Sequence, residues 1–156
     1  MKYTRNSDPN FYETHLTNCG SFALSIEEWY SPDETLSEKF DGLDDYFIDV
    51  EDMCGGDVMD MSEVFATDLA EVILDDFTDL EYLPYIEVEE VEGLIAFRAF
   101  FDGSDWWDFH FKVFRDGRWQ EKNGRDPVHD CELEDWTYGP LDYVSRTFYF
   151  LPKQAS

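Results

Sequence analysis

The sequence has no long apolar run and few basic residues. None of its hydrophobic stretches approaches the ~20 residues that cross a bilayer, and the polar residues 1–16 lack the apolar segment of a secretory signal. Only 11 Lys and Arg stand against 37 Asp and Glu, giving a net charge of −26. We therefore expect a cytoplasmic protein with no membrane partner. Direct binding to nucleic acid is not expected, because such a surface repels phosphates.

Cysteine and histidine are scarce and scattered, which argues against a metal site. Cys19, Cys54 and Cys131 are 35 and 77 residues apart, a spacing that matches no zinc pattern. His129 lies two residues before Cys131, but a metal would need further ligands. The glycine pair at 55–56 lacks the Lys-Ser/Thr that completes a phosphate-binding loop. We expect no metal, no cofactor and reduced thiols.

Negative charge is concentrated in one segment. Between Glu27 and Glu92 there are 24 Asp and Glu residues and one basic residue, Lys39, so this block carries −23 and the rest of the chain −3. The 156 residues fit one domain, with residues 31–92 as an acidic, insertion-like segment. Such a block is either a solvated face or a surface that attracts a basic partner or mimics a nucleic-acid backbone.

Helical spacing comes first along the chain and strand alternation second, which predicts an α+β fold. Asn18 is a good N-cap for a helix ending at 31–33. Residues 33–57 are acidic and interrupted by glycines, with a short apolar stretch at 46–48, and Cys54 is expected in a loop. A second helix is expected from about Ser62 to Phe77. The expected strands are 85–88, 94–101, 106–115, 118–122 and 146–151, with a tight turn at Asp116-Gly117.

Cys19 opens the first expected helix, and His110 lies on the strand 106–115. Free N–H groups and the positive end of the helix dipole favour a thiolate at a helix start, and Gly20 would leave the sulfur approachable. His110 lies on the strand face opposite Phe109 and Phe111. An imidazole near such a thiol can take its proton and pass it to a leaving group.

Two stretches resemble cysteine hydrolases. Residues 18–24, Asn-Cys-Gly-Ser-Phe-Ala-Leu, resemble the helix start of papain-like and NlpC-type enzymes. Asp108-Phe109-His110-Phe111 followed by Gly117-Arg118-Trp119 and Lys122-Asn123-Gly124 resembles the histidine hairpin of a branch common in bacterial and phage genomes. The strand at 143–150 resembles that branch's closing strand. The similarity covers the first helix and about residues 94–152, and it leaves out the acidic segment.

The resemblance implies a papain-like domain, with the helix carrying Cys19 packed on an antiparallel sheet carrying His110. It implies thiol chemistry but no substrate, because the family includes peptidases, amidases and transferases.

A third polar group should orient the imidazole of His110. If Asp116-Gly117 forms a two-residue turn, His110 faces Asn123 across the hairpin. Asn123 is therefore our first candidate, with Glu121 and Asp126 as alternatives. An oxyanion hole would use the Cys19 N–H and a second donor from Asn18 or His15.

Two functions follow. The first is a cysteine hydrolase with Cys19, His110 and Asn123 as catalytic residues, in which the acidic segment selects a basic protein or peptide substrate. The second is a non-catalytic acidic inhibitor that binds a basic partner protein. It would be an anti-defence, immunity-type or nucleic-acid-mimic protein, acting in the host cytoplasm if a phage encodes it. Neither interpretation predicts an oligomeric state.

Overall fold

The computed structural model describes residues 3–83, 89–103, 106–138 and 141–153. Within this part of the chain the helices are α1 (Pro9–Thr14), α2 (Cys19–Leu24), α3 (Pro32–Lys39), α4 (Leu43–Cys54) and α5 (Val58–Asp76). The strands are β1 (Leu80–Leu83), β2 (Ile95–Phe101), β3 (Trp107–Arg115), β4 (Arg118–Lys122), β5 (Val128–Asp130), β6 (Thr137–Tyr138), β7 (Leu141–Asp142) and β8 (Phe148–Pro152). The α+β class predicted from the sequence is confirmed.

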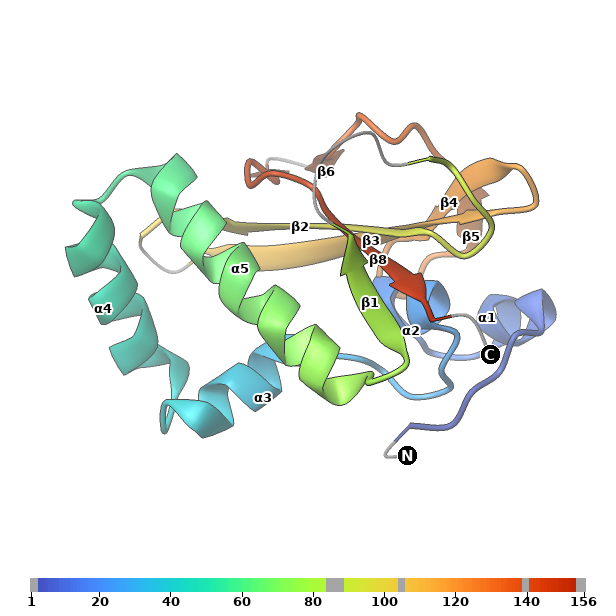
Figure 1. Cartoon of the computed structure of the whole chain (residues 1–156), viewed down its shortest axis with the longest axis horizontal. Helices are drawn as coiled ribbons and strands as arrows, with labels where there is room; N and C mark the ends of the chain where they lie inside the picture. The colour runs from blue at the N-terminus through green and yellow to red at the C-terminus, as the bar shows by residue number, and fades with distance from the viewer. Residues whose placement is uncertain (1–2, 84–88, 104–105, 139–140, 154–156) are drawn as a thin grey trace.

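Six of these strands form one antiparallel sheet in the order β1-β8-β2-β3-β4-β5, while β6 and β7 pair separately. Figure 1 shows α3, α4 and α5 gathered beside this sheet, with α1 and α2 toward its other end. None of the helices in the described residues has the length and apolar character required to span a bilayer.

Hydrophobic residues form two clusters, one on each face of the sheet. Along β2 and β3, Phe97, Phe111 and Val113 belong to the cluster beneath the helices, whereas Ala96 belongs to the smaller cluster built around Trp136 and Tyr149. This alternation follows from the period of two in a strand. It also places His110 on the face opposite Phe111, as the sequence predicts.

Residues 33–57 contain most of α3 and all of α4, so the expectation that Cys54 lies in a loop was wrong. Pro32 starts α3, because the first position of a helix needs no N–H donor. Gly55, with φ 62°, ends α4 at Cys54, which is therefore a helical residue. Tyr46 and Val50 lie one turn apart on α4 and are buried in the main core.

The helix that begins at Cys19, α2, is shorter than predicted, and the helix expected from about Ser62, α5, is longer. Ser25 adopts φ 57° and ends α2 after Leu24 rather than near residue 31. Asp57 caps α5 and starts it before Ser62. A short helix that the sequence did not predict, α1, lies in the polar N-terminal stretch.

The strand predictions for the hairpin region are confirmed, and β8 matches the last expected strand. Arg115 pairs with Arg118, and Asp116 and Gly117 both have positive φ, as a two-residue hairpin turn requires. The strand expected at 85–88 lies outside the described residues.

Candidate active site

Cys19 is the first residue of α2, and both ends of this helix are tied down. At its start, Asn18 Oδ1 accepts from the Ser21 N–H at 3.0 Å, while Ser21 Oγ accepts from the Asn18 N–H at 3.3 Å. This reciprocal capping box satisfies donors that a helix start leaves free. At its end, the Arg115 guanidinium donates to the carbonyl oxygens of Phe22 and Ala23. The position of Cys19 on the sheet is therefore fixed by β3 itself.

Gly20 is needed for close packing rather than for access to the sulfur, which corrects the sequence interpretation. A Cβ at this position would lie 3.1 Å from a Tyr30 ring carbon and 3.3 Å from a Phe111 ring carbon. The helix start therefore sits directly on β3, and Cys19 is only 6% exposed.

The Cys19 thiol is neutral at rest. Burial raises its pKa to about 12, and the charge of Asp108 adds to that effect. Hydrogen bonding from the backbone N–H groups of Phe111, Gly20 and Cys19 itself acts in the opposite direction. These N–H groups surround the sulfur with donors that can stabilise negative charge once it develops there or on an adjacent oxygen.

His110 is buried on β3, and its ring is held by Glu121 of β4. His110 Nε2 lies 2.8 Å from Glu121 Oε1. An ionised carboxylate only accepts hydrogen bonds, so Nε2 carries the proton and Nδ1 keeps its lone pair. Burial lowers the pKa of His110 more than Glu121 raises it. A neutral imidazole with a basic Nδ1 is the form that a general base needs.

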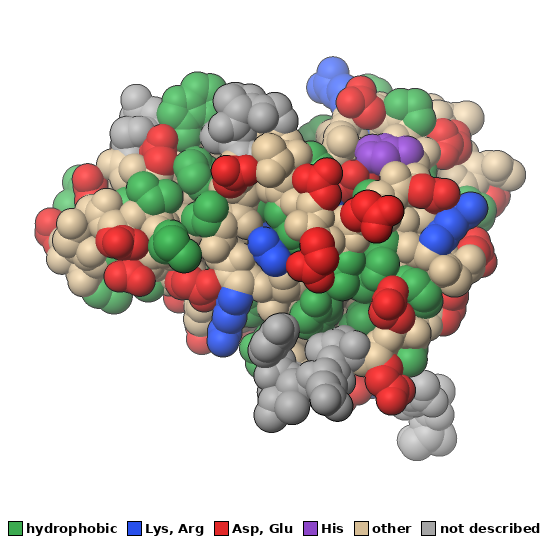
Figure 2. All heavy atoms as spheres, turned by 90° about the horizontal axis from the view of Figure 1, so that it is seen from above, with side chains coloured by type: hydrophobic (Ala, Val, Ile, Leu, Met, Phe, Trp, Pro, Cys, Tyr) green, Lys and Arg blue, Asp and Glu red, His purple; other side chains and the backbone are tan. Residues whose placement is uncertain are grey.

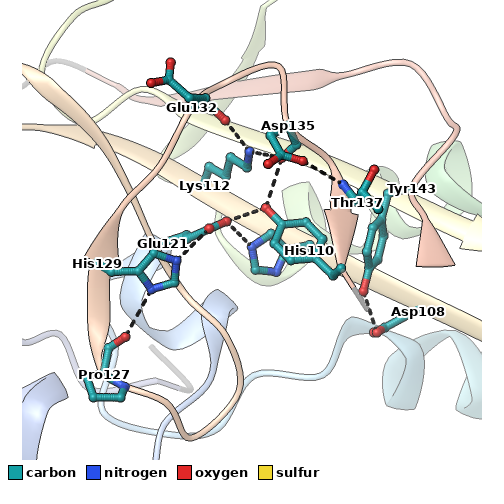
Figure 3. Close-up of polar contacts among 11 residues, drawn as sticks. Asp108, His110, Lys112, Glu121, Pro127, His129, Glu132, Asp135, Thr137 and Tyr143 are labelled. Carbon is teal, nitrogen blue, oxygen red and sulfur yellow. Dashed lines mark hydrogen bonds and ion pairs between the residues drawn. The ribbon is translucent and has the colours of Figure 1, made fainter. Parts of the chain in front are cut away.

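Glu121 is the centre of a hydrogen-bond network. Its Oε2 lies 2.8 Å from His129 Nε2, and the Tyr138 hydroxyl donates to its Oε1. Figure 3 shows the carboxylate between the rings of His110 and His129, which come from β3 and β5. Burial raises the pKa of Glu121, but hydrogen bonds from these three side chains outweigh that effect and hold it at about 2. Glu121 is therefore ionised at every pH near neutrality.

Glu121, and not Asn123, is the hydrogen-bond partner of His110, so our first candidate for the orienting residue was wrong. In the described residues no hydrogen bond joins Asn123 to His110. The ladder between β3 and β4 pairs Arg115 with Arg118 and continues only to Val113 and Gln120. For His110 to lie directly opposite Asn123, the ladder would have to extend by three more residue pairs. Asp126, the other alternative, is exposed.

Cys19 and His110 both line a pocket of about 920 Å³. Its size suits a small ligand or a peptide side chain. The sequence missed Asp33, Asp108 and Tyr143 as lining residues, because they come from three separate elements or loops. Asn123 also lines this pocket, and its Oδ1 is buried without a hydrogen-bond partner in the described part of the chain.

The other sequence candidates lie elsewhere. His15 stacks on Phe11 and does not line the pocket, so it is not a second oxyanion donor. Cys54 and Cys131 are free thiols. Over the described ranges, no group of three or more His, Cys, Asp or Glu residues is arranged to hold a metal ion.

Comparison with protein-family models, with curated proteins and with solved structures finds no match.

Proposed function

We propose that this chain is a cytoplasmic cysteine hydrolase with a papain-like fold. Cys19 would be the nucleophile, His110 the general base and acid, and Glu121 the residue that orients the imidazole. The observation that carries the proposal is the pocket shared by Cys19 and His110, together with the 2.8 Å hydrogen bond from His110 Nε2 to Glu121. That bond leaves Nδ1 free to accept a proton.

In the proposed reaction, His110 Nδ1 takes the thiol proton as the Cys19 sulfur attacks an acyl carbon. The carbonyl oxygen gains negative charge, which the N–H groups around the sulfur can stabilise. The imidazolium then protonates the leaving amine, the carbon–nitrogen bond breaks, and a thioester forms. Water, deprotonated by His110, hydrolyses the thioester and restores the thiol.

The pKa of about 12 for Cys19 makes His110 essential in this scheme. Without a base, only about one thiol in 10⁵ would be ionised at pH 7. The reactive thiolate must therefore form by transfer of the thiol proton to His110 when an electrophile is bound. A preformed ion pair is not part of the proposal.

Alkylation by iodoacetamide at pH 7, followed site by site by mass spectrometry, tests this scheme. Cys19 should react despite its burial, and His110→Ala should slow its reaction at least about a hundredfold. Cys54, at the exposed end of α4, is an internal reference whose rate His110→Ala should leave unchanged. An inert Cys19 beside reactive Cys54 and Cys131 would contradict the proposal.

A second function is favoured by the surface of the acidic helices. Figure 2 shows acidic side chains spread over one face of the molecule, with few basic ones among them. Among the described residues of the acidic segment, the most exposed large apolar side chains are those of Met53 (71%), Met59 (64%) and Ile48 (56%). Apolar side chains surrounded by one sign of charge are typical of a protein-binding surface. We therefore propose, as the alternative, that α4 and the start of α5 bind a basic partner protein.

Partner capture by the Cys19→Ala variant separates the two functions. A basic protein bound at low salt and released at high salt should also be lost on Ile48→Lys and Met53→Lys. Leu16→Lys, at an equally exposed site outside the segment, is the matched control. Retention of the same partner by all three lysine variants would refute the binding surface.

A further inference from the structure

The pocket lined by Cys19 and His110 also contains two carboxylates, and none of its lining residues in the described part of the chain is Lys or Arg. Asp33 comes from the first turn of α3, and Asp108 comes from β3, two residues before His110. Five aromatic side chains complete the lining: Trp29, Trp107, Phe109, Tyr138 and Tyr143. Carboxylates combined with aromatic rings are the chemistry that recognises an organic cation.

Asp33 has no cation partner in the described part of the chain. Burial, together with the smaller effects of the charges on Glu34 and Asp108, raises the pKa of its carboxyl to about 6, against the opposing effect of its own backbone N–H. A carboxylate that is partly desolvated and close to other negative charges is stabilised strongly when a cation arrives.

Asp108 is positioned but not neutralised. Its Oδ1 accepts from the Phe109 N–H at 2.8 Å, and its Oδ2 accepts from the Tyr143 hydroxyl at 2.6 Å. Figure 3 shows Asp108 pointing to the hydroxyl of Tyr143. Two neutral donors fix the carboxylate and leave its charge uncompensated.

Asn123 adds an amide group to the lining of this pocket. Its Oδ1 is a buried acceptor without a partner, and an unsatisfied buried acceptor is uncommon because it costs about 1–3 kcal/mol. The pocket offers two carboxylates to a ligand, those of Asp33 and Asp108.

We propose that the substrate carries a cationic group, the ammonium or guanidinium of a Lys or Arg residue, which binds between Asp33 and Asp108 beside the acyl carbon attacked by Cys19. This inference rests on the proposed hydrolase function and names its substrate class. In this proposal Asp33 and Asp108 set specificity.

Alkylation of Cys19 by probes of different charge tests the inference. The probes are 2-bromoethylammonium, iodoacetamide and iodoacetate, each with its rate divided by that for a free cysteine derivative. The cationic probe should be favoured over the anionic one by at least about tenfold in the wild type. Asp33→Asn and Asp108→Asn should each reduce this preference severalfold.

Asp52→Asn is the matched control, because it removes the same charge from an exposed position outside the pocket. It should change the preference less than about twofold. Equal effects of Asp33→Asn and Asp52→Asn would overturn the inference, since the preference would then come from the net charge alone. No alkylation of Cys19 by any probe would instead contradict the hydrolase function itself.

A binding measurement covers the case in which Asp33→Asn fails to fold. Calorimetry with Cys19→Ala should detect binding of acetyl-arginine amide and weaker or no binding of acetyl-norleucine amide. Equal affinity for the two ligands would refute the cation site.

Discussion

Replacing Glu121 by Gln tests how much the central carboxylate contributes to the folded state. The side chain is 5% exposed, and its pKa falls from 4.5 to about 2 on folding. A shift of about 2.5 pKa units corresponds to about 3 kcal/mol of stabilisation by the ionised form. Gln keeps the shape and one acceptor for His110 Nε2, so we expect a loss of about 2–3 kcal/mol at pH 7.

The pH dependence of that loss gives the sharper measurement. A folded-state pKa below the unfolded one adds stability that is complete above pH 4.5 and is lost as pH falls through about 2. The difference between wild type and Glu121→Gln should therefore narrow by about 2 kcal/mol between pH 7 and pH 3. Urea unfolding at the two pH values measures both quantities.

Glu71→Gln is the control, because Glu71 is exposed on α5. It should change stability by less than about 0.5 kcal/mol. If Glu121→Gln behaves like this control, or if its effect does not depend on pH, the carboxylate does not hold the two histidines as described. If Glu121→Gln lowers stability but leaves the rate of Cys19 alkylation unchanged, Glu121 has a structural role and no part in the catalytic scheme.

Three further predictions concern the helix start and the pocket. Asn18→Ala removes the cap of α2 and should cost about 1–2 kcal/mol in urea unfolding; an unchanged rate of Cys19 alkylation in this variant would show that the cap does not position the thiol. Gly20→Ala should destabilise by about 1–3 kcal/mol through the crowded contact with the sheet, although Ala normally favours a helix, so any stabilisation would contradict the packing. The preference of Cys19 for the cationic probe should weaken as pH falls below about 6, because Asp33 then becomes protonated; a flat profile from pH 5 to 8 would exclude Asp33 as the recognition group.

The sheet was predictable from the sequence to a greater extent than the acidic helices. Residues 94–101 and 106–115 show the alternation of two strands, and Asp116-Gly117 is a typical two-residue turn. These local signals predict the strands and the hairpin turn directly. Helix α4 was missed because its acidic residues hide a short apolar stripe of Tyr46 and Val50. That stripe packs against α5, where the Tyr46 ring lies 6.3 Å from the ring of Phe65, and the sequence pattern of α4 alone does not show this partner.

The site shows the same division between local and non-local signals. Asn18 and Cys19 are placed by a local capping pattern, which the sequence contains in full. The partner of His110 depends on where the β3–β4 ladder stops, and no local signal marks that point. Glu121 reaches His110 diagonally across the hairpin, a geometry open to long side chains but not to Asn. The sequence prediction counted only residues directly opposite His110 and therefore chose Asn123.

The acidic pocket also gives a physical reason for a neutral thiol in the resting protein. The charge of Asp108 contributes to the high pKa of Cys19, and the same charge is the one that a cationic substrate would compensate. Binding of a Lys or Arg side chain beside Asp108 therefore lowers the cost of forming the thiolate, at the moment when an acyl carbon is within reach. Without the substrate the thiol stays protonated and resists oxidation, because the thiolate is the reactive form. On this reasoning, recognition of the cation and activation of the nucleophile depend on the same carboxylate. Asp108→Asn should therefore raise the reactivity of Cys19 toward neutral iodoacetamide while it reduces the preference for the cationic probe severalfold.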